Sequence, residues 1–177
     1  MKRRQMLKHI SLAGSLAVAS GAGYLYLTRA SRQQDLTIEK MVADLKAIDT
    51  TRLVHLGEWS PATIFAHCSQ SIAFSMTGYP AHESEFFKNT IGPLAFNLFA
   101  SLGKMKHNLA EAIPGAADIE ANDSQTALNE LIYRLEEFDR YAGNLAPHFA
   151  FGELSKSEYT LAHLMHINNH FDELRTT

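Results

Sequence analysis

Histidine is the residue type with the clearest chemical potential in this 177-residue chain, where it occurs nine times. His166 and His170 are four residues apart. In a helix this spacing stacks two imidazoles on one face, so that both can bind one metal ion. At about 100° per residue, His163 falls with them inside a sector of about 60°. Apolar residues share that half of the helix, where an imidazole is costly unless its nitrogens have partners. Two interpretations stay open, namely metal ligands and hydrogen-bonded histidines.

A third ligand must come from another helix and face inward. His67 is the best candidate, because Ile64, Ser71 and Phe74 fall on the same face of its predicted helix. A hydrogen-bonded core histidine is the alternative. Cys68 follows His67 but points about 100° away on a helix, so we interpret it as a small buried side chain.

Other ionisable residues have less defined roles. His163 could be an alternative ligand, a partner that orients a ligand, or a proton carrier. His107 lies in a long loop and could approach the site from outside, although an exposed position is the simpler expectation. Glu58, Glu111 and His163 are conceivable bases, and their spacing selects none of them. The remaining histidines of the domain lie near predicted element ends, and we expect them at the surface: His55, His82 and His148.

The elements that position these residues are predicted to be helices, because the apolar spacing from Asp35 onward is helical and no stretch alternates. Start and stop signals place helices from Thr37 to about Asp49, from Ser60 to Gly78, from about His82 to Gly103 with a break at Ile91–Pro93, from about Ser124 to Leu145, and from Ser155 to about Leu174. Residues 104–122 form a long loop, which we expect to line a pocket. The economical arrangement is an all-α four-helix bundle without any β-sheet.

Composition excludes several functional classes. Residues 35–177 carry 10 Lys/Arg against 19 Asp/Glu, a net charge of −9, whereas nucleic-acid binding needs a basic surface. One cysteine excludes an internal disulfide framework and a cysteine-rich zinc site.

The first 34 residues are predicted to be a targeting segment that is separate from the domain at 35–177. They hold six Lys/Arg and no acid, and an uncharged run follows from Ile10 to Leu27. Arg3-Arg4 with Leu7-Lys8 resembles a bacterial twin-arginine export signal, and an ordinary signal with a chance Arg-Arg is the alternative. Cleavage after Ala17–Ala19 and retention as an anchor both stay open. We expect a periplasmic protein, or one anchored to the periplasmic face of the inner membrane.

Several motifs together resemble one family. Trp59-Ser60-Pro61, the segment His67–Ser71, the segment Met76–Pro80, Ile113-Pro114-Gly115 and the segment His163–Phe171 are similar to the DinB/YfiT-like superfamily, and within it to the DUF1569 group. The resemblance covers roughly residues 37–175.

This resemblance implies an up-down-down-up four-helix bundle in which three histidines bind a divalent metal at one end. Position by position these are His67, His166 and His170. Relatives with known activities are mostly metal-dependent, thiol-linked transferases or isomerases. Small thiols are scarce outside the cytosol, so we do not carry the thiol chemistry over to an exported domain. The Arg-Gly-Gln that often follows the last histidine in DinB proteins is replaced here by Phe171-Asp172-Glu173.

Two functions from different classes remain. The first is a metalloenzyme of the cell envelope, in which three imidazoles leave a coordination position for water or a small substrate. The second is a non-catalytic bundle that holds a metal or a small ligand. Imidazoles bind Zn, Ni, Cu and Fe alike, so the metal stays open. Expected partners are an unknown small substrate, the twin-arginine translocase and, through residues 10–27, the membrane; a homodimer also stays open. An open pocket at the three histidine nitrogens would favour the enzyme.

Overall fold

A computed structural model describes residues 36–177, and the signal or anchor predicted for residues 1–34 lies outside the described residues. The described chain is mostly helical. Its helices are α2 (Ile38–Lys46), α3 (Pro61–Thr77), α4 (Glu85–Asn89), α5 (Ile91–Leu102), α6 (Ser124–Arg140) and α7 (Lys156–Phe171). A 3-10 helix, η1 (Thr50–Arg52), and two strands, β1 (Leu53–His55) and β2 (Leu174–Thr176), complete it. Between residues 36 and 177, no helix is long and apolar enough to cross a membrane.

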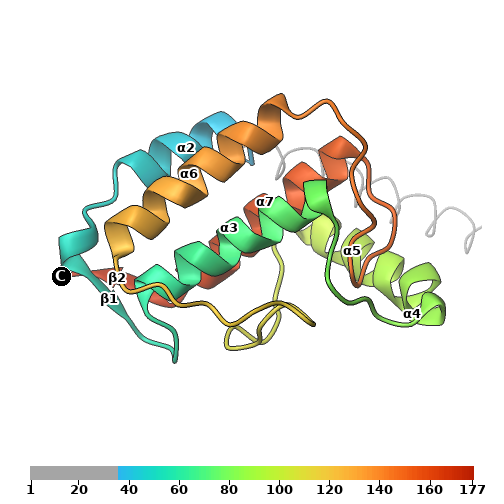
Figure 1. Ribbon diagram of the computed structural model, residues 1–177, viewed down its shortest axis with the longest axis horizontal. Coiled ribbons are helices and arrows are strands. Elements are labelled where there is room, and N and C mark those ends of the chain that lie inside the picture. Colours follow the sequence, from blue (N-terminus) through green and yellow to red (C-terminus); the bar gives the residue numbers. More distant parts are fainter. Residues whose placement is uncertain (1–35) are drawn as a thin grey trace, which may run out of the picture.

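Helices α2, α3, α6 and α7 enclose the main core. α3 packs against α6 and α7, and α2 packs against the same two helices. In Figure 1, α3 and α6 run from left to right, while α2 and α7 run back from right to left. The core is filled by large side chains with almost no exposure, including Leu45, Phe65, Leu131, Leu135, Phe138 and Tyr159. The predicted predominance of helices is confirmed.

A small sheet contradicts the prediction of a domain without any strand. β1 pairs antiparallel with β2, so that Leu53 lies opposite Thr176 and His55 opposite Leu174. The backbone N–H of Leu56 donates to the carbonyl of Glu173 at 2.8 Å and extends the contact. Strands of three residues are too short to show alternation, and their long-range pairing leaves no local pattern. The sheet ties the segment before α3 to the segment after α7.

Capping residues set the helix starts as predicted. The Thr37 side chain accepts from the backbone N–H of Lys40 at 3.1 Å, and the Ser60 side chain accepts from that of Thr63 at 3.1 Å. Ser155 and Glu158 form both hydrogen bonds of a capping box at the start of α7. These caps fix where α3 and α7 begin, and therefore which residues face the core.

Other helix boundaries differ from the prediction, and α2 already ends at Lys46 and α4 begins at Glu85. The break between α4 and α5 falls at Thr90, because Pro93 lies in the first turn of α5, where a backbone N–H has no helical acceptor. α6 ends at Arg140 rather than Leu145, and the ammonium of Lys156 donates to the carbonyls of Phe138 and Tyr141. α7 ends at Phe171, because the following residues enter the sheet.

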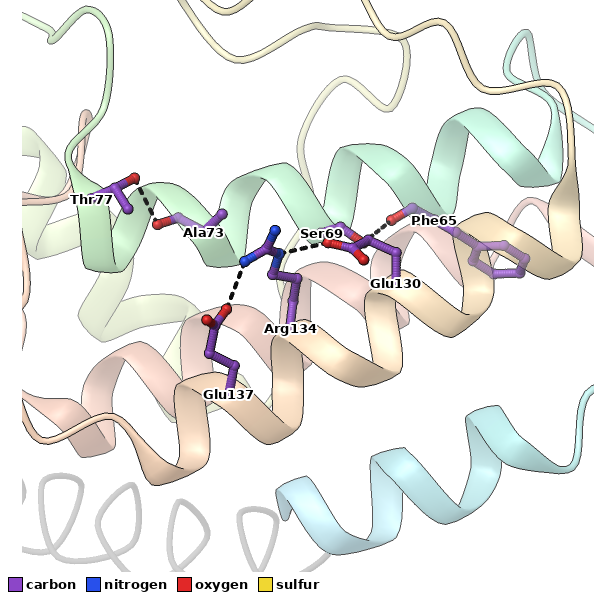
Figure 2. A network of polar contacts seen from close by, with 7 residues as sticks. All are labelled: Phe65, Ser69, Ala73, Thr77, Glu130, Arg134 and Glu137. Carbon is purple, nitrogen blue, oxygen red and sulfur yellow. Dashed lines mark hydrogen bonds and ion pairs between the residues drawn. The ribbon is translucent and has the colours of Figure 1, made fainter.

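The polar side chains of α3 and α6 that Figure 2 draws bond within their own helix. The hydroxyl of Ser69 donates to the carbonyl of Phe65 at 2.9 Å, which satisfies a buried polar group without help from α6. Arg134 pairs with Glu130 and Glu137 at 2.7 Å each along α6, and all three side chains are partly exposed. Such partly exposed pairs contribute about 1 kcal/mol or less, so apolar packing holds α3 against α6.

Candidate metal centre

Four histidines converge between α3, α7 and the loop that joins α5 to α6. His67 comes from α3, His166 and His170 from α7, and His107 from the loop. One ligand atom from each residue lies within 4.8 Å of the others. The Nε2 atom of His166 is 3.2 Å from Nε2 of His67 and 3.1 Å from Nε2 of His170. These four residues could therefore bind one metal ion.

The three Nε2 atoms fit metal ligation better than mutual hydrogen bonding. A neutral imidazole nitrogen carries either one proton or one lone pair, so Nε2 of His166 cannot form two well-directed hydrogen bonds at once. Nitrogens bound tetrahedrally to a zinc-like ion at ~2.0–2.1 Å lie roughly 3.3 Å apart. The observed separations of 3.1 and 3.2 Å are close to that value. A shared cation would satisfy all three lone pairs.

Burial keeps these imidazoles in the neutral form that metals require. Loss of solvation, helped by the neighbouring His107, lowers the pKa of His67 to about 4. Burial, with the charges of His67 and His107, lowers the pKa of His170 to about 3. The pKa of His166 is held well below its ordinary value, mainly by burial. No carboxylate of the described residues belongs to the group, so a bound divalent ion would keep its positive charge for a further ligand.

An aromatic side chain, rather than a hydrogen-bond acceptor, orients two of the rings. The Nδ1 atoms of His67 and His170 are buried and have no hydrogen-bond partner among the described residues. The indole of Trp59 stacks on the ring of His170 at 5.8 Å between centroids and an angle of 5°. The same indole meets the ring of His67 edge-on at 4.8 Å. This differs from the usual arrangement, in which the second nitrogen of a ligand donates to a carboxylate or carbonyl.

The buried amide of Asn169 holds His107 beside the other three rings. Oδ1 of Asn169 accepts from the backbone N–H of His107 at 3.2 Å and lies 3.0 Å from its Nδ1. Because this oxygen can only accept, Nδ1 of His107 carries the proton and Nε2 keeps its lone pair. The ring of His107 lies 4.9 Å from that of His166. Of the two positions expected for His107, exposed in the loop or approaching the site from outside, the second is confirmed, because this residue is a member of the group.

A cavity of about 370 Å³ opens beside the group and is lined by His67, His107 and His166. Most of its remaining wall is apolar, with phenylalanines from α4, α5 and the α6–α7 loop. The predicted role of the 104–122 loop is confirmed, since Met105–His107 and Glu111–Pro114 line this cavity. Its volume lies in the range of small-molecule sites. Three of the four clustered histidines therefore line an open cavity, whereas His170 lies behind them and is fully buried.

Residues 30–177 match the family described as a protein of unknown function, DUF1569. The chain belongs to this family. No curated protein and no solved structure matches it. Family membership therefore identifies no reaction, and any assignment for this DUF1569 protein rests on the chemistry of its site.

His163 lies apart from the four clustered histidines of this DUF1569 protein. Its Nε2 atom is 3.1 Å from the hydroxyl oxygen of Ser75, whose own proton goes to the carbonyl of Ile72 at 2.6 Å. Nε2 of His163 therefore donates to Ser75. His163 therefore shares a helix face with His166 and His170 but makes a different contact. This bond does not support His163 as a replacement ligand. Burial lowers the pKa of His163 to about 3.

His148 is buried, and its predicted surface position is wrong. Its Nδ1 atom accepts from the backbone N–H groups of Ala150 and Phe151, both at 3.1 Å, and its ring stacks on Phe151. Burial lowers its pKa to about 3. The phenylalanines at 149 and 151 are the sequence feature that indicates an apolar, buried position for His148. His55 and His82 are exposed and Cys68 is fully buried, as expected.

Proposed function

We propose that this DUF1569 protein is a divalent-metal-dependent enzyme that acts on a small substrate by hydrolysis or Lewis-acid chemistry. Its ligands are His67, His166 and His170. His107 supplies a fourth imidazole, so water or substrate would take a fifth coordination position, beyond the tetrahedral four. The observation that carries the proposal is the convergence of three Nε2 atoms, 3.1 to 3.2 Å apart in two pairs, beside a cavity of about 370 Å³ that His67 and His166 line. A closed structural site would have no such cavity.

In this proposal, the residues around the cavity have separate roles in the reaction. A Zn, Ni or Fe ion bound there would supply Lewis acidity. Glu111 is the proton acceptor that we favour, because it lines the cavity and lies near His107. Burial lowers the pKa of His107, and the charge of Glu111 opposes part of that shift. Glu83 also lines the cavity. Glu58 is exposed and does not line the cavity. Apolar side chains on the opposite wall exclude water and hold the carbon skeleton of the substrate.

The course of the helices supports the proposal that the fold is DinB-like. α3 and α6 run one way and α2 and α7 the other (Figure 1), which is the up-down-down-up order. One clustered histidine lies on the second of these four helices and two, spaced i and i+4, lie on the last. Thiol chemistry is not part of this proposal.

Blocking the cavity tests the enzymatic function. Ala112 is exposed at the cavity wall, so Ala112→Trp should fill it without touching a ligand. We expect metal content to be unchanged and metal-dependent turnover of small esters, amides or lactones to fall on the order of 100-fold. Ala117→Trp, on an exposed residue of the same loop outside the cavity lining, is the matched control. Equal turnover in both variants would place the reaction elsewhere, and a metal-loaded protein without turnover would favour the non-catalytic bundle.

Asn169 offers a separate test of the fourth imidazole. Asn169→Ala removes both hydrogen bonds to His107, so the loop ring loses its orientation. We expect metal affinity to fall by ~10–100-fold, the usual effect of losing a group that orients a ligand. Asn168→Ala, an exposed neighbour of the same type, should bind as tightly as the wild type. Equal affinity of the two variants in a competition titration would show that His107 does not contribute.

Export through the twin-arginine route is part of the same proposal. Changing Arg3 and Arg4 together to Lys keeps the charge but removes the guanidinium pair. We expect the double variant to stay in the cytoplasm, while the wild type reaches the periplasm or its membrane face. Fractionation of cells measures the outcome, and normal export of the double-lysine variant would show an ordinary signal.

A further inference from the structure

Helix α5 is apolar on two opposite sides, and only one of them is covered. Gly92, Phe96 and Ala100 are buried, and Phe96 and Ala100 pack with residues of α7. The other side lies within a sector of about 80° at about 100° per residue. Its residues, together with Phe86 of α4, form what we call the apolar stripe: Phe86 (72% exposed), Ile91 (49%), Leu94 (72%), Leu98 (57%) and Leu102 (40%). Exposed apolar side chains gathered on one helix face are typical of interaction sites.

Two lysines that follow α5 carry positive charge at one end of the apolar stripe, although residues 35–177 carry a net charge of −9. Acidic residues lie at the other end, where Glu85 is next to Phe86 on α4. Lys104 and Lys106 are exposed and directly follow α5. Lys88 lies on α4 and pairs with Glu85 at 2.6 Å. An apolar helix face flanked by lysines is typical of a surface that binds anionic lipid.

The described chain begins next to α5. Leu36, the first described residue, packs on the main core and on the cluster of Phe96 and Ala100, which lies on the covered side of α5. The sequence before Leu36 contains the uncharged run Ile10–Leu27, whose 18 residues approach the ~20 that span a bilayer. A bilayer that held this run would be tethered to the domain through residues 28–35, which lead to Leu36.

We propose that the apolar stripe docks on an anionic lipid bilayer, with its leucines at the acyl boundary and Lys104 and Lys106 at the headgroups. This surface is independent of the proposed metal chemistry. The cavity nevertheless lies next to it, since Phe87, Phe99 and Lys106 line the cavity wall. A docked protein would thus present its cavity close to the membrane.

Depth-dependent quenching tests the docking. The full chain carrying Leu98→Cys, labelled with an environment-sensitive fluorophore, is reconstituted in vesicles of phosphatidylcholine and phosphatidylglycerol that contain brominated lipid. Cys68 is fully buried and does not react. Tyr133→Cys, on the exposed face of α6, is the matched control on the same tether. We expect several-fold stronger quenching at position 98 than at position 133. Ile91→Glu with Leu94→Glu should lower quenching at 98 to the control level, while circular dichroism shows an intact fold.

The lysines and the competing occupants give further outcomes. Lys104→Glu with Lys106→Glu should weaken quenching at 98 in anionic vesicles, and added salt should do the same to the wild type. Equal quenching at 98 and 133 would mean that only the N-terminal segment contacts the membrane, which would contradict docking of the apolar stripe. If the fluorophore at position 98 is already shielded from water before vesicles are added, the proposal is overturned. Shielding that increases with protein concentration would mean that a second copy covers the apolar stripe. Shielding that does not depend on concentration would mean that residues 10–27 cover it.

Discussion

His166→Ala is expected to abolish stoichiometric binding of a divalent metal, and His170→Ala to do the same. Nε2 of His166 lies 3.1 to 3.2 Å from both partner nitrogens, so its loss leaves two imidazoles that no longer share a neighbour. Metal content after loading and dialysis measures the effect. His55→Ala, at an exposed position on β1, is the matched control and should retain the metal. His163→Leu should retain it too, because that ring bonds to Ser75. Complete loss in the His163 variant, with retention in the His166 variant, would refute the ligand assignment.

Melting temperatures give the same prediction an independent readout. A ligand that binds only the native state adds about 2.7 kcal/mol at a concentration 100 times its Kd. For a chain of this size, that corresponds to a shift of roughly 5–10 °C. Chelation should lower the melting temperature of the metal-loaded wild type by this amount and leave the His166 variant unchanged. A wild type that melts identically with and without chelator would contradict native-state binding.

The second large effect is a loss of stability in mild acid. Burial lowers the pKa of His148 and of His163 to about 3 in the folded protein, against an ordinary value of ~6.5 in the unfolded chain. Between pH 6.5 and 3 these two histidines are protonated in the unfolded state and neutral in the native state. The free energy of unfolding therefore falls as the pH falls, by about 1.4 kcal/mol per pH unit for each group. From pH 7 to pH 5 each histidine should cost about 2 kcal/mol.

Single replacements separate these two histidines from the metal site. In the presence of chelator, His163→Leu should reduce the slope of unfolding free energy against pH by one group's share, while Ser75 keeps its bond to Ile72. His55→Leu, at an exposed position, should leave the slope unchanged. Denaturant unfolding at a series of pH values measures both. A His163 variant with the wild-type slope would show that this ring is not the source of the acid sensitivity.

Local sequence signals predicted the helices, because caps and apolar spacing act over a few residues. Thr37, Ser60 and Ser155 each make the capping bond that their position indicated. The sheet could not be predicted in the same way, since its strands of three residues pair from opposite ends of the described chain. The C-terminal end of α6 also depends on a distant group, the ammonium of Lys156.

The candidate site likewise combines features that local spacing predicts with features that depend on contacts between distant residues. The i, i+4 spacing of His166 and His170 and the inward face of His67 predicted three residues that the structure does bring together. Helical spacing alone could not separate His163 from them, because the choice depends on Ser75 on a neighbouring helix. Two positions stayed open for His107 because its place is set by a loop and by Asn169, which is distant in sequence.

X-ray absorption at the edge of the bound metal tests the central claim most directly, on full-length protein purified from the compartment in which it accumulates. The proposed site predicts a first shell that includes three or four imidazole nitrogens at ~2.0–2.1 Å for a zinc-like ion, with the outer-shell scattering of histidine rings. His170→Ala should lose one imidazole from this shell or lose the metal altogether. A bound metal surrounded only by oxygen, or a first shell unchanged in the His170 variant, would contradict a metal centre at His67, His166 and His170.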